Sequence, residues 1–142
     1  MADDGGAIPV QVARDRAPDL ADGTGQTFSR IQPILDLAAV GSRSQASADA
    51  FAAEYGVPRP HGTYESLVAD PDIDIVYVAS PHSHHRDHAL LALEAGKHVL
   101  IEKAVTLDAA QAEEIRTAAT SRGLLAMEAM WTRYLPHMGR IR

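Results

Sequence analysis

Short apolar segments alternate with segments of helical periodicity from Leu35 onward, and this order narrows the fold more than any other property of the chain. Strands are predicted over residues 35–40, 73–79, 98–102 and 124–127. Residues 75–79 are apolar without alternation, which is typical of a strand covered on both faces of a parallel sheet. The order therefore predicts βαβ units and an α/β fold, with a parallel sheet and helices on both faces.

Four helices are predicted between these strands, over residues 46–55, 63–68, 83–95 and 108–121. Glycines at positions 56, 96 and 123 follow three of them, as expected for left-handed helix ends. Pro81 and Ser83 are expected to open the third helix, with Ser83 as its cap and Ala89, Leu90, Leu91 and Leu93 on its buried side.

The first 34 residues have a weaker pattern. Residues 7–12 alternate like a strand, but Pro9 cannot donate to a ladder and favours an edge position. The best candidate for a phosphate-binding glycine loop, Gly23-Thr24-Gly25, lacks a third glycine and follows no clear strand. The first βα unit is therefore predicted to be atypical or incomplete, with a loop over residues 15–26.

Composition excludes several classes of protein. A chain of 142 residues is one domain, and 46% hydrophobic with 23% charged residues is typical of a soluble protein. The net charge of −6 argues against a nucleic-acid surface, and no segment is apolar enough for a membrane span. The acidic N-terminus without an apolar run makes a cytoplasmic location the default. The absence of cysteine excludes disulfides and thiolate chemistry.

Lys103 stands out because the chain holds eleven arginines and only two lysines. It follows a predicted strand and Glu102, at the carboxyl edge where ligands of α/β sheets collect. A lysine in a cleft can release and regain a proton, whereas arginine stays charged. A proton-transfer role is the hypothesis, and an accidental placement is the alternative.

Four histidines, His82, His84, His85 and His88, lie within seven residues after the strand 73–79. His84 and His88 share a helix face, as in some metal sites, but no HExxH pattern is present. Alternatively, the imidazoles lie at the first turn of a helix capped by Ser83, or the turn borders a bound dinucleotide. The last interpretation is favoured.

Gly41-Ser42-Arg43-Ser44 follows the first clear strand. In dinucleotide-binding folds an acid at this place binds the ribose hydroxyls, whereas an arginine accommodates a 2′-phosphate. Ser42 and Arg43 could hold a phosphate by charge-assisted hydrogen bonds, and a solvated loop is the alternative. Farther on, residues 127–136 place the only tryptophan with an arginine and a tyrosine after a strand.

Together these segments resemble the nucleotide-binding half of the glucose–fructose oxidoreductase / inositol dehydrogenase (Gfo/Idh/MocA) family, nearest its dihydrodiol-dehydrogenase-like branch. The resemblance runs from about residue 35 to residue 142 and rests on residues 40–44, 69–79, 81–88, 92–103 and 127–133. It implies a Rossmann-like, NAD(P)-binding domain over residues 35–130. Residues 1–34 would be a poorly defined segment, and residues 131–142 the start of a link to a missing substrate domain.

The resemblance also implies an activity, hydride transfer to or from a sugar- or diol-like alcohol, with NADP as cofactor and NAD as the alternative. Lys103 matches the lysine of the family's Glu-Lys-Pro motif, so Lys103 and Glu102 are the expected catalytic residues. The expected cofactor-binding residues are Ser42, Arg43, Ser80, Pro81, His82, His85, Glu102, Lys103, Trp131 and Arg133.

The chain departs from the family pattern in ways that affect this expectation. Ala104 stands where the family has proline, which would loosen the backbone after Lys103. Without a recognisable glycine loop or substrate domain, we expect a fragment with negligible turnover. A non-catalytic nucleotide-binding module or remnant is the alternative, and a histidine-rich metal protein is a third, weaker one. No metal, nucleic-acid or membrane partner is expected, and homo-oligomer formation is left open.

Overall fold

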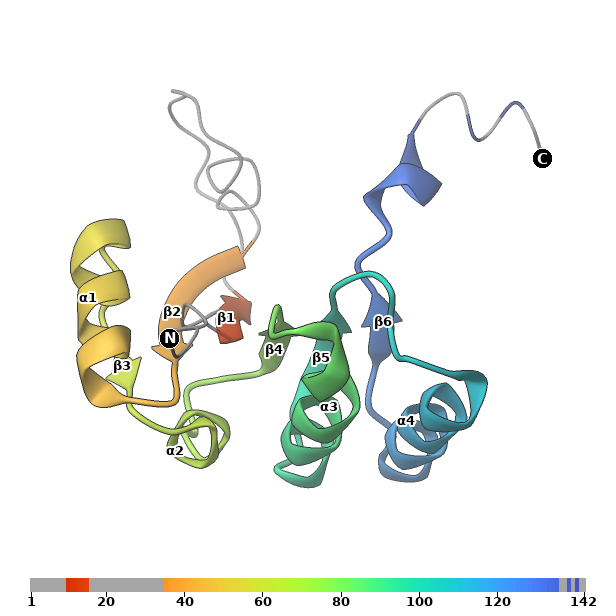
Figure 1. Cartoon of the computed structure of the whole chain (residues 1–142), viewed down its shortest axis with the longest axis horizontal. Coiled ribbons are helices and arrows are strands. Elements are labelled where there is room, and N and C mark those ends of the chain that lie inside the picture. The colour runs from red at the N-terminus through yellow and green to blue at the C-terminus, as the bar shows by residue number, and fades with distance from the viewer. Residues whose placement is uncertain (1–9, 16–34, 136–137, 139, 141–142) are drawn as a thin grey trace, which may run out of the picture.

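A six-stranded sheet with helices packed against it forms the molecule (Figure 1). The computed structural model describes residues 10–15, 35–135, 138 and 140. The strands are β1 (Val10–Asp15), β2 (Leu35–Gly41), β3 (Pro60–His61), β4 (Ile75–Val78), β5 (His98–Ile101) and β6 (Ala126–Glu128). The helices are α1 (Gln45–Tyr55), α2 (Tyr64–Val68), α3 (His85–Glu94) and α4 (Ala109–Arg122), with 3₁₀ turns η2 (His82–His84) and η3 (Trp131–Tyr134).

The strand order is β3-β2-β1-β4-β5-β6. The pairs β2–β3, β4–β5 and β5–β6 are parallel, which confirms the predicted parallel sheet for these strands. β1 runs antiparallel to both of its neighbours, β2 and β4. β2 and β4 therefore point the same way, and all strands except β1 end at one edge of the sheet.

The central position of β1 corrects the expectation of an edge strand based on Pro9. Pairing begins at Val10, one residue after that proline, so every residue within β1 can donate to the ladder. A proline just before a strand does not restrict the strand to an edge. The predicted glycine loop at residues 23–25 lies outside the described residues.

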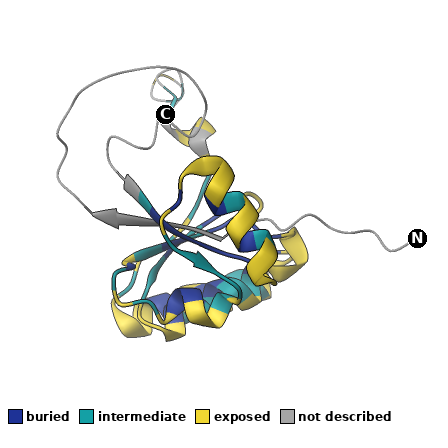
Figure 2. Ribbon diagram, turned by 90° about the vertical axis from the view of Figure 1, so that its left-hand side faces the viewer, coloured by how far each residue is buried: buried dark blue, intermediate teal, exposed yellow. Residues whose placement is uncertain are grey.

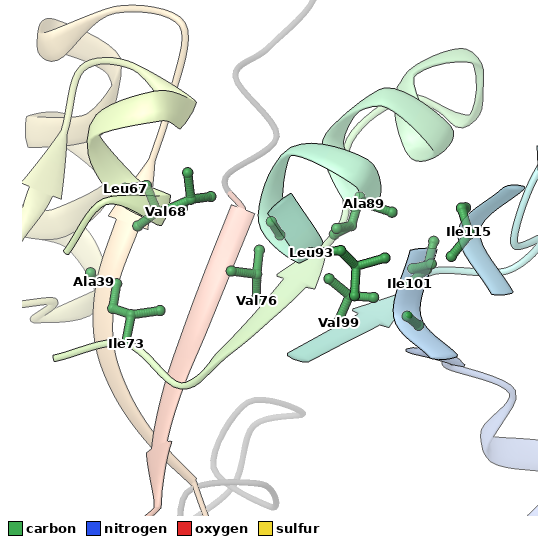
Figure 3. Packing of buried hydrophobic residues seen from close by; sticks show 13 residues of the cluster. Ala39, Leu67, Val68, Ile73, Val76, Ala89, Leu93, Val99, Ile101 and Ile115 are labelled. Carbon is green, nitrogen blue, oxygen red and sulfur yellow. The ribbon is translucent and has the colours of Figure 1, made fainter. Parts of the chain in front are cut away.

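The main core lies between the sheet and the row of helices α2, α3 and α4 (Figures 1 and 3). Its strand residues include Ala39 of β2, Val76 of β4 and Val99 of β5, and Figure 3 shows them facing Leu67 of α2 and Leu93 of α3. Buried residues follow the strands and the inner sides of the helices (Figure 2).

A second, smaller cluster packs α1 against β2. It comprises Val40, Ala52 and Val57, with Leu37 and Phe51 at its margin. Because Ala39 and Val40 are successive residues of one strand, they point to opposite faces of the sheet. The helices therefore cover both faces, as the sequence predicted.

Local sequence signals set most helix ends as predicted. Thr63 caps α2 by accepting the backbone N–H of Ser66, and Gly56 and Gly123 end α1 and α4 with φ of 69° and 67°. Among the described residues, no helix is long and apolar enough to cross a bilayer.

The start of α3 differs from its prediction. The turn η2 precedes the helix, and the residue at the cap position is His84, without a side-chain cap bond, so Ser83 is not the cap. The buried residues of α3 are His85, Ala89, Ala92 and Leu93, while Leu90 and Leu91 are only half-buried. Backbone carbonyl oxygens lie within 3.0 Å of both ring nitrogens, so His85 finds polar partners in a buried place that apolarity alone assigned to leucine.

Candidate functional site

The carboxyl edge of the sheet brings together most of the predicted site residues. Ser42 and Arg43 follow β2, residues 80–82 follow β4, and Glu102 and Lys103 follow β5. Val78, Ile101 and Glu128 are in register at the ends of β4, β5 and β6, so the loops leaving these strands are neighbours. Trp131 and Arg133 lie on η3, the turn that follows β6.

Lys103 is exposed at this edge, and its backbone is held by the residue before it. Its N–H donates to Oε2 of Glu102 at 3.0 Å, and the other Glu102 oxygen accepts the hydroxyl proton of Tyr77. Burial, together with the Glu102 carboxylate, raises the pKa of Tyr77 and keeps its phenol a donor. Glu102 thus contacts the backbone of Lys103 and the hydroxyl group of Tyr77.

The turn after Lys103 is held by three side chains from other elements. Nδ1 of His85 lies 3.0 Å from the carbonyl oxygen of Ala104, and Nε2 of His82 lies 2.8 Å from that of Thr106. Between them, the N–H of Val105 donates to Oε1 of Glu128 at 3.0 Å. The peptide bond joining Lys103 and Ala104 is cis.

His85 is 2% exposed. Its second ring nitrogen, Nε2, lies 2.9 Å from the carbonyl oxygen of Ser80, so both nitrogens face backbone carbonyls. The ring thus joins the loops that follow β4 and β5. Its expected contact with the cofactor stays a prediction.

The remaining histidines also have partners. Nδ1 of His88 lies 2.8 Å from Oγ of Ser80, and the His84 ring stacks on His88 at 5.6 Å between centroids. Burial, and secondarily the charge of His84, lowers the pKa of His88. Within the described part of the chain, no three His, Cys, Asp or Glu side chains are grouped in a way that could hold a metal ion.

The end of β2 carries a buried hydroxyl. Ser42 is 1% exposed, and its N–H donates to the His61 carbonyl at 3.0 Å. Among the residues that the structure describes, its Oγ has no hydrogen-bond partner. Arg43 beside it is exposed. Burial raises the pKa of Tyr64, and the charge of Arg43 opposes that shift. Tyr64 packs on His88 at 4.4 Å between ring centroids, which joins the start of α2 to α3.

β1 does not contribute its carboxyl end to this edge. Its last residue, Asp15, pairs with Leu35, the first residue of β2, at the opposite side of the sheet. A glycine loop that cradles a diphosphate normally follows the first strand at the carboxyl edge. In the part of the chain that the structure describes, no strand delivers such a loop between β2 and β4.

Sequence reasoning missed Tyr77 and Glu128. Tyr77 pairs with Leu100, two residues before Glu102, so the tyrosine and the acid lie on the same face of adjacent strands. The one hydroxyl within the apolar run 75–79 was the available signal. For Glu128, the signal was a carboxylate at the end of the strand beside β5.

Comparison with known proteins identifies this arrangement. The model of the Gfo/Idh/MocA oxidoreductase family, which describes an NAD-binding Rossmann fold, matches residues 13–130. The chain belongs to this family. Its Gfo/Idh/MocA relatives include a D-xylose 1-dehydrogenase (NADP⁺) from Hypocrea jecorina, 56% identical over 84 residues. Another is the trans-1,2-dihydrobenzene-1,2-diol dehydrogenase of Bos taurus, 41% identical over 118 residues. The resemblance to the dihydrodiol-dehydrogenase-like branch is thereby confirmed.

Solved structures of Gfo/Idh/MocA type share the fold. The 3-ketoreductase KijD10 from Actinomadura kijaniata, in complex with NADP, aligns with a TM-score of 0.71 and 37% identity over 77% of this chain. The aligned parts are 59% of this chain and 22% of the xylose dehydrogenase, and 82% of this chain and 35% of the bovine enzyme. The part of KijD10 that aligns is 34% of the KijD10 chain. The chain thus spans about a fifth to a third of the length of these relatives.

Proposed function

We propose that this chain binds NADP along the carboxyl edge of its sheet and is the nucleotide-binding part of an oxidoreductase that acts on a sugar- or diol-like alcohol. The observation that carries the proposal is the arrangement at that edge, where Ser42 with Arg43 and Lys103 with the loop 80–82 stand at the ends of parallel strands. Family membership and NADP in the names of the xylose dehydrogenase and the KijD10 complex support the choice of cofactor.

The end of β2 suits the adenosine side of NADP. A buried hydroxyl without a partner has lost its hydration, and Oγ of Ser42 is such a group within the described part of the chain. A phosphate oxygen would satisfy it, and the Arg43 guanidinium would add charge-assisted hydrogen bonds. The absence of an acid in residues 41–44 favours a 2′-phosphate over a free ribose hydroxyl.

The ends of β4 and β5 suit the nicotinamide side. Pro81 and His82 are exposed there and would border the nicotinamide ribose, with Trp131 and Arg133 reaching the cofactor from η3. A bound nicotinamide supplies the hydride chemistry. Lys103 would hold the hydroxyl proton of the alcohol at its Nζ and return it in the reverse direction, as a general acid/base. Glu102 would orient Lys103 through its backbone N–H.

A second candidate function is nucleotide binding without catalysis. The direction of β1 favours it, because the usual diphosphate loop is not delivered to the site by this strand. The chain would then contact only the adenosine and nicotinamide sides of the cofactor. Binding would be weak, with a dissociation constant of about 1 mM. Binding is common to both candidates, and turnover above a Lys103→Ala baseline would exclude the second.

Binding can be tested by titrating the chain with NADP while following its melting temperature and the fluorescence of Trp131, the only tryptophan. Ligand at ten times its dissociation constant stabilises a protein by about 1.4 kcal/mol. This corresponds to about 4 °C for a domain of this size. We expect that shift with NADP and a smaller one with NAD, which lacks the 2′-phosphate.

Arg43→Ala should remove the preference for NADP over NAD. Arg116→Ala is the matched control, since Arg116 is an exposed arginine on α4 that pairs with Glu113. A concentration of about 10 mM NADP is about ten times the dissociation constant expected for the weaker mode of binding. If neither the melting temperature nor the fluorescence responds to it, the proposal is wrong. Equal loss in both variants would instead show a nonspecific charge effect and refute the role of Arg43.

A further inference from the structure

One peptide unit in the turn after Lys103 is held at both of its polar ends. The carbonyl oxygen of Ala104 and the N–H of Val105 belong to the same planar unit. Nδ1 of His85 lies 3.0 Å from that oxygen, and the N–H donates to Oε1 of Glu128 at 3.0 Å. His85 begins α3 and Glu128 ends β6, so the two contacts come from separate elements.

We propose that His85 and Glu128 form a clamp on this peptide unit and are positioning residues for Lys103. Neither touches the reacting groups, and both act through the backbone that carries the amine. The inference rests on the proposed function for its consequence, because Lys103 is the residue placed beside the nicotinamide. The clamp itself can be tested without any cofactor.

The chemistry of the two partners suits a clamp. A carboxylate accepting an N–H forms a charge-assisted hydrogen bond, which is stronger than a neutral one. His85 is 2% exposed, so the ring side of its part-buried contact with Ala104 lies in the protein interior. Its Nε2 lies 2.9 Å from the Ser80 carbonyl, which anchors the ring to the loop after β4.

The clamp also accounts for two features that the proposed function leaves unexplained. Ala104 occupies the family's proline position, and the expectation was a looser backbone. Side-chain contacts replace the restraint that a proline ring would supply. The second feature is the cluster of histidines in residues 82–88. Two of them hold the loop after Lys103: His82 contacts the carbonyl of Thr106, and His85 contacts the carbonyl of Ala104.

The first test measures amide hydrogen exchange at Val105 by NMR on the chain without cofactor. Glu128→Ala removes the acceptor and should accelerate exchange at Val105 by about tenfold or more. Glu128→Gln keeps an acceptor oxygen and should restore most of the protection. His85→Ala should accelerate the same amide, and added imidazole should reverse part of the effect.

Leu93→Ala is the matched control for general destabilisation, because Leu93 is a fully buried residue of α3. It should raise exchange throughout the core without singling out Val105. The clamp is refuted if Val105 exchanges no faster in Glu128→Ala than in Leu93→Ala. Should His85→Ala fail to fold, Glu128→Ala decides the question, since Glu128 is only half-buried at the end of a strand.

The second test follows the side-chain NMR signal of Lys103. With two lysines in the chain, selectively labelled protein gives two side-chain NMR signals, and Lys97 serves as an internal reference. NADP should shift the Lys103 signal in the parent chain, and Glu128→Ala should reduce that shift by half or more while affinity changes less than twofold. An unchanged shift at saturation would overturn the positioning role. Failure of the parent chain to bind NADP would refute the proposed function and leave the exchange result standing.

Discussion

His88, the last of the four histidines in residues 82–88, contacts side chains of two other segments. Its ring packs on Tyr64 at 4.4 Å, and its Nδ1 lies 2.8 Å from Oγ of Ser80. Burial lowers its pKa below the ordinary value of 6.5, helped by His84 and opposed by Asp87 and Glu65. The folded protein thus binds a proton at His88 less readily than the unfolded chain.

This shift predicts a loss of stability in acid. Between the lowered folded pKa and the unfolded value of about 6.5, the unfolded chain binds more protons, so the free energy of unfolding falls as pH drops through that range. His88→Asn should therefore lose less stability than the parent between pH 7 and pH 5, measured by urea unfolding. His84→Asn should keep most of the loss, because burial is the larger cause. Equal losses in the parent and His88→Asn would contradict the prediction.

At the scale of the element, the capping residues of α4 mark where the helix begins and ends. α4 begins at the cap Asp108, which accepts the Gln111 N–H, and ends at Gly123, whose N–H bonds to the carbonyl of Ala119. Gly123 has a φ of 67°, and a Cβ built there would meet no atom within 4 Å. The cost of a side chain at this position is therefore backbone strain alone.

Gly123→Ala should lower the free energy of unfolding by about 1 kcal/mol, since the left-handed conformation disfavours a Cβ. Gly123→Asn should cost less, because asparagine tolerates that conformation better. Urea unfolding gives both values, with an unchanged slope expected. Ser121→Ala, an exposed change in the same turn, should have little effect. A neutral Gly123→Ala would show that the helix end relaxes without this cap.

At the scale of the whole molecule, the sheet presents one side of a site. Lys103 is exposed, so water reaches its amine, and an exposed acid/base neither orients an alcohol nor excludes solvent. The 142-residue chain by itself should therefore show negligible NADP-dependent oxidation of sugars or diols. Absorbance of NADPH checks this, with Lys103→Ala as the baseline. Activity above that baseline would contradict the prediction and exclude the non-catalytic alternative.

Local patterns predicted much of this fold, and contacts between distant segments account for what they missed. The presence of α1 and β4 follows from periodicity and capping residues that lie within one segment, although β4 spans Ile75–Val78 where residues 73–79 were predicted. The direction of β1 depends on pairing with β2 and β4, and no residue of β1 specifies it. The place of Lys103 was predictable because strand ends gather at one edge. The position of Glu128 at a strand end was visible in the sequence, but its contact with Val105 spans 23 residues, so no local pattern predicts that partner.

The contacts of Ala104 and Val105 also determine the stage of folding at which the backbone around Lys103 becomes ordered. A proline restricts its neighbours in the unfolded chain as well as in the native one. His85 and Glu128 act only after α3 and β6 have docked on β5, so the restraint is a product of tertiary folding. A partly opened molecule would retain the lysine but lose its orientation. Thermal fraying of α3 or β6 should therefore release the backbone beside Lys103 below the temperature at which the sheet itself melts.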